Sequence, residues 1–523
     1  MAICNDKTKE SIKNKKNSIK RFLLGRAGFM LFLLLIQILI LLWGVDVLGD
    51  MFSYLWGSFN IISALVVVYI INRNDNPAYK LAWMLPVLVF PVFGGLLYLF
   101  VRLNIPAIAV KNRIWSIELK TRPIITSDDE VIEHIENAHP HLSRISRYID
   151  SITGMKVYKG SNIKYFPTGE DKYKELLIQL EKAEKFIFLE YFIIEEGCMW
   201  NSVLEILERK VKEGVEVRIM YDGLGTLTKL PHNYDKYLRS KDIKTKVFLP
   251  VAPVLSTIQN NRDHRKIFVI DGKCAFNGGV NLADEYINEK EVFGHWKDSA
   301  VMVTGEAVQS YTLMFLQMWN IDEKQPEDYK KYLNASVEEE GEGYICAFYD
   351  NPLIFDRVGK TVYMDMLNTA KEYVHITTPY FLPDNELLTS MITAAKSGID
   401  VKMIIPHIPD KKIPFIMARS YYQLLIESGV RVYEYEPGFI HAKNFVSDDK
   451  RAVVGTINLD FRSLYLHFEC ATYFEGCKAV SDVEEDFQKT LEECIPVTYE
   501  YISEIPFWEK TLGRFLRIFA PLM

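Results

Sequence analysis

The sequence predicts an α/β protein in which two similar lobes, each a mixed sheet flanked by helices, follow an N-terminal membrane region. Three observations support this prediction. A motif of five positions occurs twice, the same order of strands and helices precedes each copy, and the first hundred residues contain three apolar runs. With 523 residues the chain is also too long for one ordinary domain.

The apolar runs lie at residues 27–48, 52–71 and 81–101, after a basic tail. About 20 apolar residues suffice to cross a bilayer core of ~30 Å, and the first run is longer than the apolar part of a signal peptide. The third run contains Pro86 and Pro91, so it predicts either a span or a re-entrant hairpin. We therefore expect a multi-pass protein of the cell membrane.

Charge is distributed unevenly along the chain. Residues 1–26 hold eight Lys and Arg against two acidic side chains, although the whole chain has a net charge of −7. Because basic segments stay on the cytoplasmic side, this tail and the catalytic lobes are predicted to face the cytoplasm. The acidic remainder is a poor surface for nucleic acid, which selects basic faces, so no nucleic-acid partner is expected.

The strands and helices of the two lobes follow from hydrophobic patterns. The first lobe is predicted to contain a buried strand, a helix and two further strands, at residues 185–194, 201–214, 215–221 and 245–249. The second repeats this order at residues 373–381, 386–398, 399–406 and 429–435. Equivalent positions are separated by about 180 residues, which indicates an internal duplication rather than a short-period solenoid.

These patterns divide the chain into six parts. They are an N-terminal membrane region, a polar connector, the first lobe, a charged linker, the second lobe and an amphipathic segment, at residues 1–103, 104–155, 156–321, 322–343, 344–503 and 504–523. In the last part, one helical face would carry Trp508, Leu512, Phe515, Leu516 and Phe519. That face predicts either a helix packed on the catalytic body or one that lies on anionic lipid.

The doubled motif has the form H-x-K-x4-D-x6-G-(G/T)-x-N. Its chemistry-bearing positions are His264, Lys266, Asp271 and Asn281 in the first copy, and His441, Lys443, Asp448 and Asn458 in the second. The two histidines are 177 residues apart. A lone H-x-K arises readily by chance, but five positions repeated at identical spacing do not.

This doubled motif resembles the signature of the phospholipase D superfamily, and its flanks at residues 261–267 and 455–463 are more narrowly similar to those of bacterial cardiolipin synthases. The resemblance covers the whole chain, including the apolar runs. It implies two phospholipase D-like lobes that transfer a phosphatidyl group from one phosphatidylglycerol to another, giving cardiolipin and glycerol. It also implies a covalent phosphohistidine intermediate.

Phosphodiester exchange needs a nucleophile and an acid for the leaving alkoxide, and imidazole serves both roles near neutral pH. Two lobes related by a pseudo-dyad would place one histidine on each side of the phosphorus. By analogy with the family, His264 is expected to attack and His441 to protonate the leaving glycerol.

The other motif residues suggest how the phosphate is held. If the motif segments are strands, Lys266 and Lys443 share a face with their histidines and clamp the phosphate oxygens, while Asn281 and Asn458 add neutral donors. The family pattern includes Asp271 and Asp448 with the catalytic residues, but their odd offset from His predicts structural ion pairs facing away. Asp298 and Glu469, at matching positions, are better candidates for orienting the histidine rings.

Two positions depart from the family pattern. Gly279 stands where relatives usually have Ser, and His467 stands where they often have Asn. We interpret His467 as a bystander in preference to an extra phosphate contact. No metal or cofactor is expected, because the lysines supply positive charge and the seven cysteines form no C-x-x-C pair.

Two other functions remain compatible with the motif. A phospholipase D-type hydrolase or headgroup-exchange enzyme would use the same residues, and fold alone does not choose the substrate. A non-catalytic membrane scaffold is disfavoured because both copies retain His, Lys and Asp.

Overall fold

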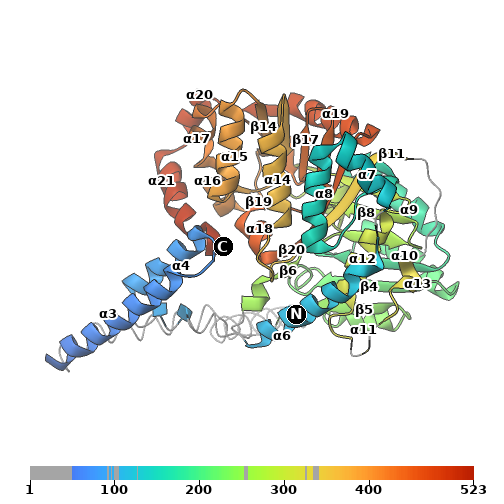
Figure 1. The fold of residues 1–523 in the computed structure, drawn as a ribbon, viewed down its shortest axis with the longest axis horizontal. Coiled ribbons are helices and arrows are strands. Elements are labelled where there is room, and N and C mark those ends of the chain that lie inside the picture. Colours follow the sequence, from blue (N-terminus) through green and yellow to red (C-terminus); the bar gives the residue numbers. More distant parts are fainter. Residues whose placement is uncertain are drawn as a thin grey trace, which may run out of the picture. The chain divides into compact units, whose positions relative to one another are not determined.

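The computed structural model describes residues 50–90, 94–95, 97–98, 105–126, 128–251, 257–323, 325, 327–333 and 341–522 (Figure 1). The chain forms two compact units. The larger one comprises Val110–Pro250 and Asn261–Arg517 and contains both lobes, and the smaller one includes the N-terminal helices. The first predicted apolar run, residues 27–48, lies outside the described residues.

The smaller unit contains α3 (Asp50–Ile71) and α4 (Pro77–Val89). The side chain of Asn76 caps α4 by accepting a hydrogen bond from the amide of Ala78, and Pro77 suits the first helical turn because no partner is needed for its nitrogen. Over the described residues, we find no helix with both the length and the apolar character needed to cross a bilayer. The span predicted at residues 52–71 is therefore not confirmed, and the run at residues 81–101, predicted as a span or a re-entrant hairpin, lies partly outside the described residues.

The first lobe is built on a seven-stranded mixed sheet. In spatial order its strands are β2 (Asn162–Phe166), β10 (Ala300–Thr304), β8 (Cys274–Gly278), β7 (Ile267–Ile270), β3 (Phe186–Tyr191), β4 (Glu216–Asp222) and β5 (Lys244–Phe248). β3, β4 and β5 are parallel, and the other neighbours are antiparallel. The predicted strands and their order along the chain are confirmed.

Helices cover both faces of this sheet. All six residues of β3 are buried, as expected for a central strand. Leu189 belongs to a core cluster with residues of α9 (Gly169–Glu181) and α10 (Cys198–Lys212). On the other face, Phe188 stacks on Phe315 of α12 (Val308–Trp319) with ring centroids 4.7 Å apart.

The second sheet repeats this arrangement. Its strands are β1 (Tyr158–Gly160), β11 (Gly341–Asp350), β20 (His467–Glu475), β18 (Arg451–Gly455), β17 (Asn444–Ser447), β12 (Tyr373–Thr377), β14 (Asp400–Pro406), β15 (Arg431–Tyr435) and β21 (Cys494–Pro496). The order from β11 to β15 matches that from β2 to β5 in the first sheet, which confirms the duplication. β1 was expected in the first lobe, but Tyr158 pairs with Ile345 of the second.

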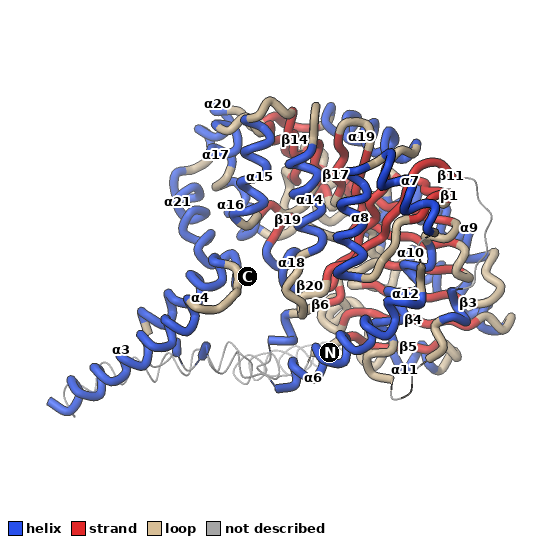
Figure 2. The backbone as a smooth tube through the Cα atoms, viewed as in Figure 1, coloured by secondary structure: helices blue, strands red, loops and turns tan. Residues whose placement is uncertain are grey.

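Helices also flank the second sheet, as Figure 2 shows. Tyr363 of α14 (Val358–Thr369) stacks on Phe445, and Phe487 of α19 (Lys478–Glu492) stacks on His375 from the opposite face. The remaining helices of this lobe are α15 (Asn385–Lys396), α16 (Lys412–Arg419), α17 (Tyr422–Glu427) and α18 (Phe461–Leu466).

Helix α12 lies between the two lobes. It contacts β3, β7 and β8 of the first sheet and β11 of the second, and every residue from Ser310 to Trp319 is buried. Its Tyr311 hydroxyl contacts the Thr472 hydroxyl of β20. An apolar helix buried all round thus joins the two halves into one body.

The connector consists of α6 (Ile105–Thr121), α7 (Asp129–Ala138) and α8 (Pro140–Thr153). It is not a separate spacer, because α8 packs on the second lobe, where the Tyr148 hydroxyl donates to Thr361 Oγ1 at 3.1 Å. The predicted linker is also partly ordered, since α13 (Lys330–Leu333) lies within it and β11 begins at Gly341.

The C-terminal segment forms α20 (Tyr499–Glu504) and α21 (Phe507–Leu516). One side of α21 packs on α16, where a Cβ at Gly513 would lie 2.6 Å from the Ile416 carbonyl oxygen. The other side is open, with Trp508 60% and Phe515 57% exposed. The helix therefore both packs on the catalytic body and presents an apolar face.

Candidate active site

The two motif histidines lie in connections that cross between the lobes. His264 follows β6 (Arg262–Asp263), which pairs with β20, and its amide donates to the Phe468 carbonyl at 2.9 Å. His441 follows β16 (Gly438–Ile440), which pairs with β9 (His295–Lys297) of the first lobe, and its amide donates to the Lys297 carbonyl at 2.6 Å. These connections are not strands, so the condition on which the lysines would share a strand face with their histidines is not met.

Each histidine ring contacts a carboxylate from the opposite lobe. Nδ1 of His264 lies 2.9 Å from Glu469 Oε2, and Nδ1 of His441 lies 2.7 Å from Asp298 Oδ2. Both acids are fully buried. Because a carboxylate accepts a hydrogen bond, it selects the tautomer with the proton on Nδ1, which leaves the Nε2 lone pair for chemistry. These are the acids that the sequence predicts as orienting residues; their part in turnover remains a prediction.

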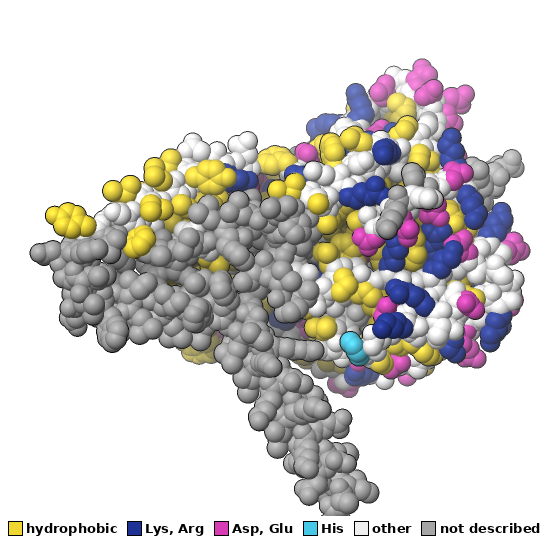
Figure 3. Space-filling view, turned by 90° about the horizontal axis from the view of Figure 1, so that it is seen from below, with side chains coloured by type: hydrophobic (Ala, Val, Ile, Leu, Met, Phe, Trp, Pro, Cys, Tyr) yellow, Lys and Arg dark blue, Asp and Glu magenta, His cyan; other side chains and the backbone are white. Residues whose placement is uncertain are grey.

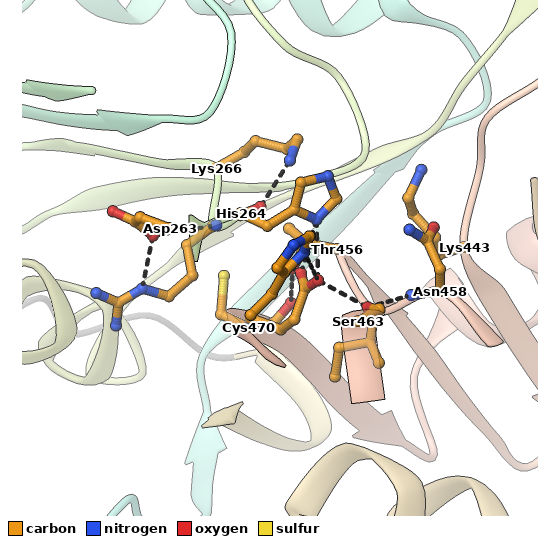
Figure 4. A network of polar contacts seen from close by, with 12 residues as sticks. Asp263, His264, Lys266, Lys443, Thr456, Asn458, Ser463 and Cys470 are labelled. Carbon is orange, nitrogen blue, oxygen red and sulfur yellow. Dashed lines mark hydrogen bonds and ion pairs between the residues drawn. The ribbon is translucent and has the colours of Figure 1, made fainter. Parts of the chain in front are cut away.

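Hydroxyl groups hold the Glu469 carboxylate in place. Ser463 Oγ donates to Oε1 at 2.7 Å and Thr456 Oγ1 donates to Oε2 (Figure 4). At the equivalent position of the first motif, a Cβ on Gly279 would lie 2.0 Å from Asp298 Oδ1. Asp298 therefore leaves no room for a side chain at Gly279.

The two motif lysines are buried, each with 1% exposure. Lys266 Nζ donates to the His264 carbonyl at 2.6 Å, Lys443 Nζ donates to the His441 carbonyl, and in Figure 4 the two lysines extend on either side of the His264 ring. Burial lowers the pKa of Lys266 to about 8 and that of Lys443 to about 7. A phosphate anion between them would stabilise both charges, so the site is suited to bind one.

Burial also lowers the pKa values of the two motif histidines. Burial and the charges of Lys266 and Lys443 hold the pKa of His264 well below its usual value. Burial and Lys443 lower the pKa of His441 to about 4, although Asp298 opposes this shift. In the free protein both rings are thus neutral at pH 7, which suits attack by His264. His441 was expected to carry a proton, and a bound anion is needed to raise its pKa.

The two motif aspartates do not form the ion pairs that we expected. Asp271 accepts hydrogen bonds from the backbone amides of residues 184–186 at 2.7–2.8 Å, and Asp448 accepts them from residues 371–373 at 2.9–3.0 Å. Asp271 directly follows β7 and Asp448 directly follows β17. Each aspartate therefore lies at the end of its strand that is farther from the motif lysine. Both have positive φ angles, 54° and 57°, which aim the carboxylate at the start of the neighbouring strand. They anchor the hairpin and do not contact the histidines.

The motif asparagines differ from each other. Asn281 uses its side chain within the fold: Oδ1 accepts from the Ile193 amide at 3.0 Å and Nδ2 donates to the Tyr286 hydroxyl at 2.7 Å. Asn458 Oδ1 is buried, and among the described residues it has no hydrogen-bond partner. Of the two, Asn458 is the better placed for a substrate.

Sequence analysis misses the aromatic walls of the site. Phe192 lies edge-on to His264 with ring centroids 5.0 Å apart, and Tyr286, Trp296 and Phe439 lie 5.5–5.8 Å from the His441 ring. The histidines are only 7% and 6% exposed. No sequence signal points to these aromatic residues, because they come from four different segments.

A buried ion-pair cluster was also missed. Arg265, inside the first motif, lies 2.5 Å from Glu190 of β3 and 3.4 Å from Asp263. Arginine and both acids are fully or almost fully buried. The cluster ties the motif connection to the sheet, whereas Ala442 occupies the equivalent position in the second motif.

His467 is not remote from the site. Its ring centroid lies 5.4 Å from that of His264, and its Nδ1 lies 3.5 Å from Glu469 Oε1. Ligand atoms of His264, His467 and Glu469 lie within 4.8 Å of one another, close enough to hold a metal ion. The expectation of no metal-binding cluster did not anticipate this grouping.

The sequence of this chain is similar to those of known proteins over the region that contains the site. A family model described as "Cardiolipin synthase, PLD-like domain" matches residues 176–319 and 363–491, which contain both motifs. The chain is 33% identical over 482 residues to a cardiolipin synthase of Alkalihalophilus pseudofirmus, covering 91% of this chain and 96% of the other. The chain belongs to the cardiolipin synthase family of the phospholipase D superfamily.

Further comparisons agree with membership in this family. An N-terminal model, Phospholipase D-nuclease N-terminal, matches residues 61–102. An uncharacterized protein of Streptococcus mutans is 46% identical over 458 residues, covering 87% of this chain and 99% of the other. The crystal structure of a phosphatidylserine synthase from Haemophilus influenzae superposes with a TM-score of 0.54 at 16% identity, over 72% of this chain and 97% of that one. This member of the family is an enzyme of the phosphatidyltransferase type.

Proposed function

We propose that the enzyme is a cardiolipin synthase, which transfers the phosphatidyl group of one phosphatidylglycerol to another and releases glycerol. The observation that carries this proposal is the pair of histidines, each joined to a carboxylate of the opposite lobe and accompanied by a buried lysine. The names of the relatives support the choice of product.

In the proposed first step, Nε2 of His264 attacks the phosphorus of phosphatidylglycerol. The bond between phosphorus and the glycerol headgroup breaks, and the departing alkoxide takes a proton from His441. In the second step a hydroxyl of another phosphatidylglycerol gives its proton to His441 and attacks phosphorus, and the phosphorus–nitrogen bond breaks. Lys266 and Lys443 stabilise the charge on the phosphate oxygens throughout.

Exclusion of water favours transfer to a lipid over hydrolysis. The histidines are almost fully buried, and aromatic rings from both lobes surround them. A glycerol hydroxyl that is already bound as part of a lipid competes well in such a site, because few water molecules can approach the intermediate.

The test is to incubate the purified full-length protein with phosphatidylglycerol vesicles and identify the products. Cardiolipin and glycerol in equal amounts are expected. Phosphatidic acid as the main product would identify a phospholipase D-type hydrolase instead.

Activity is expected to persist in excess EDTA, because the lysines supply the positive charge that a metal would otherwise provide. The measurement compares initial rates before and after chelation. Complete loss of activity that a divalent ion restores would show that a metal is required.

The buried lysines also predict the effect of pH. Because burial lowers the pKa of Lys443 to about 7, its charge is present below that pH and is lost above it in the free enzyme. kcat/KM for phosphatidylglycerol should therefore fall as pH rises above about 7. Lys443→Arg should shift this decline to higher pH, since arginine stays protonated. If the pH profile of the variant is unchanged, the decline in kcat/KM does not come from deprotonation of Lys443.

The proposed location is the membrane, with the catalytic lobes on its cytoplasmic side. The apolar N-terminal runs, the match to the N-terminal family model, and the open aromatic face of α21 support this assignment. Among the described residues on the face drawn in Figure 3, Lys and Arg side chains are interspersed with Asp and Glu.

A further inference from the structure

His467 is a buried histidine whose closest carboxylate contact, from Nδ1 to Glu469 Oε1, is 3.5 Å long. It is 7% exposed, and among the described residues neither ring nitrogen has a hydrogen-bond partner. A neutral imidazole offers a lone pair to a metal ion. Because buried polar groups are nearly always satisfied, these ring nitrogens are available to a further ligand, such as water or a metal ion.

The neighbours of His467 complete a set of metal ligands. Its Nδ1 lies 3.5 Å from Glu469 Oε1, and His264 Nδ1 lies 3.0 Å from the same oxygen. In a tetrahedral zinc site with bonds of about 2.0–2.2 Å, neighbouring ligand atoms are separated by roughly 3.3 Å. Both distances are close to that value, and all three ligand atoms lie within 4.8 Å of one another. Two imidazoles and one carboxylate, with a fourth position open, are a common zinc set.

We propose that His264, His467 and Glu469 form a reversible inhibitory site for a divalent transition metal such as zinc. The inhibition rests on the proposed role of His264 as nucleophile, whereas binding of the metal does not.

Inhibition follows from the tautomer of His264. In the free enzyme the Nδ1 proton points to Glu469, and the Nε2 lone pair is available to attack phosphorus. A metal bound at Nδ1 uses the lone pair of that nitrogen, so the ring proton moves to Nε2. The imidazole stays neutral and no proton is lost, but its attacking atom no longer has a lone pair.

The site exists in only one half of the duplicated fold. The position equivalent to His467, two residues before the orienting acid, is Trp296 in the first lobe. Its ring lies 5.6 Å from that of His441, much as His467 lies 5.4 Å from His264. An indole offers no lone pair to a metal, so only His264 is subject to this control.

The test uses the full-length enzyme, stripped of metal with EDTA and returned to chelator-free buffer. Calorimetry with zinc chloride is expected to find a site that His467→Asn weakens by about 100-fold or more. Zinc should lower the initial rate of the unaltered enzyme at least tenfold, EDTA should restore it, and the ratio of rates with and without zinc should stay near one in His467→Asn. Magnesium should have no effect, because it prefers oxygen ligands.

His139→Asn is a matched control, because this partly exposed histidine lies near Glu475, away from the site. It should bind zinc and be inhibited like the unaltered enzyme. Equal zinc affinity of the unaltered enzyme and His467→Asn would overturn the site, as would inhibition that survives in that variant. If His467→Asn turns over too slowly for its rates with and without zinc to be compared, the zinc affinities from calorimetry decide whether the site exists. An enzyme that binds zinc through His467 but makes no cardiolipin would refute the proposed function and retain the metal site.

Discussion

His441→Ala, supplied with phosphatidylglycerol labelled in its phosphatidyl group, is expected to accumulate a covalent phosphatidyl-enzyme adduct, and His264→Ala is not. The adduct should be labile in acid and stable in base, as a phosphorus–nitrogen bond to histidine is. His264 is proposed as the nucleophile by analogy with the family, and Glu469 at its Nδ1 leaves the Nε2 lone pair available for attack. Without His441 the first step slows, and the second loses its base, so the intermediate is trapped.

The adduct is measured as labelled protein after denaturation without acid. Steady-state turnover is measured separately and is expected to fall by about 1,000-fold or more in both variants. His232→Ala, which removes an exposed histidine outside the site, serves as the control and should turn over normally. An adduct found only in His264→Ala would reverse the two roles. Slow turnover with no adduct in either variant would argue against a covalent route.

Lys266→Ala and Lys443→Ala are each expected to reduce kcat/KM by about 100-fold or more. Both ammonium groups lie in a buried site, where one charged donor to a developing anion has a large effect on the transition state. The loss should appear mainly in kcat if the clamp tightens as charge develops, so the two kinetic constants are measured separately.

Each lysine has a matched control in the same hairpin. Lys273 and Lys450 lie in the exposed turns that follow β7 and β17, and alanine at either position should leave the kinetics nearly unchanged. Near-normal activity in Lys266→Ala or Lys443→Ala would remove that lysine from the phosphate clamp.

Much of the fold is readable from the sequence, because local patterns carry the information. The run at residues 185–194 becomes β3, buried on both faces, and its counterpart in the second half becomes β12 at the same place in its sheet. Spacing alone identifies the repeated His and Lys pairs, and matching positions identify Asp298 and Glu469, which contact the histidine rings. Strand periodicity correctly directs Asp271 and Asp448 away from the histidines, but positive φ angles aim their side chains at backbone amides instead of the expected ion pairs.

The sequence by itself determined that the chain is a duplicated α/β enzyme with two H-x-K motifs, since repeat spacing and hydrophobic periodicity are local properties. Only the tertiary structure decided which acid serves which histidine: β6 and β16 cross between lobes, so Glu469 meets His264 and Asp298 meets His441 across sequence separations of 205 and 143 residues. Packing likewise set His467 against His264 and lowered the pKa values of both motif lysines. Burial and through-space contact depend on the assembled lobes, and no local pattern encodes them.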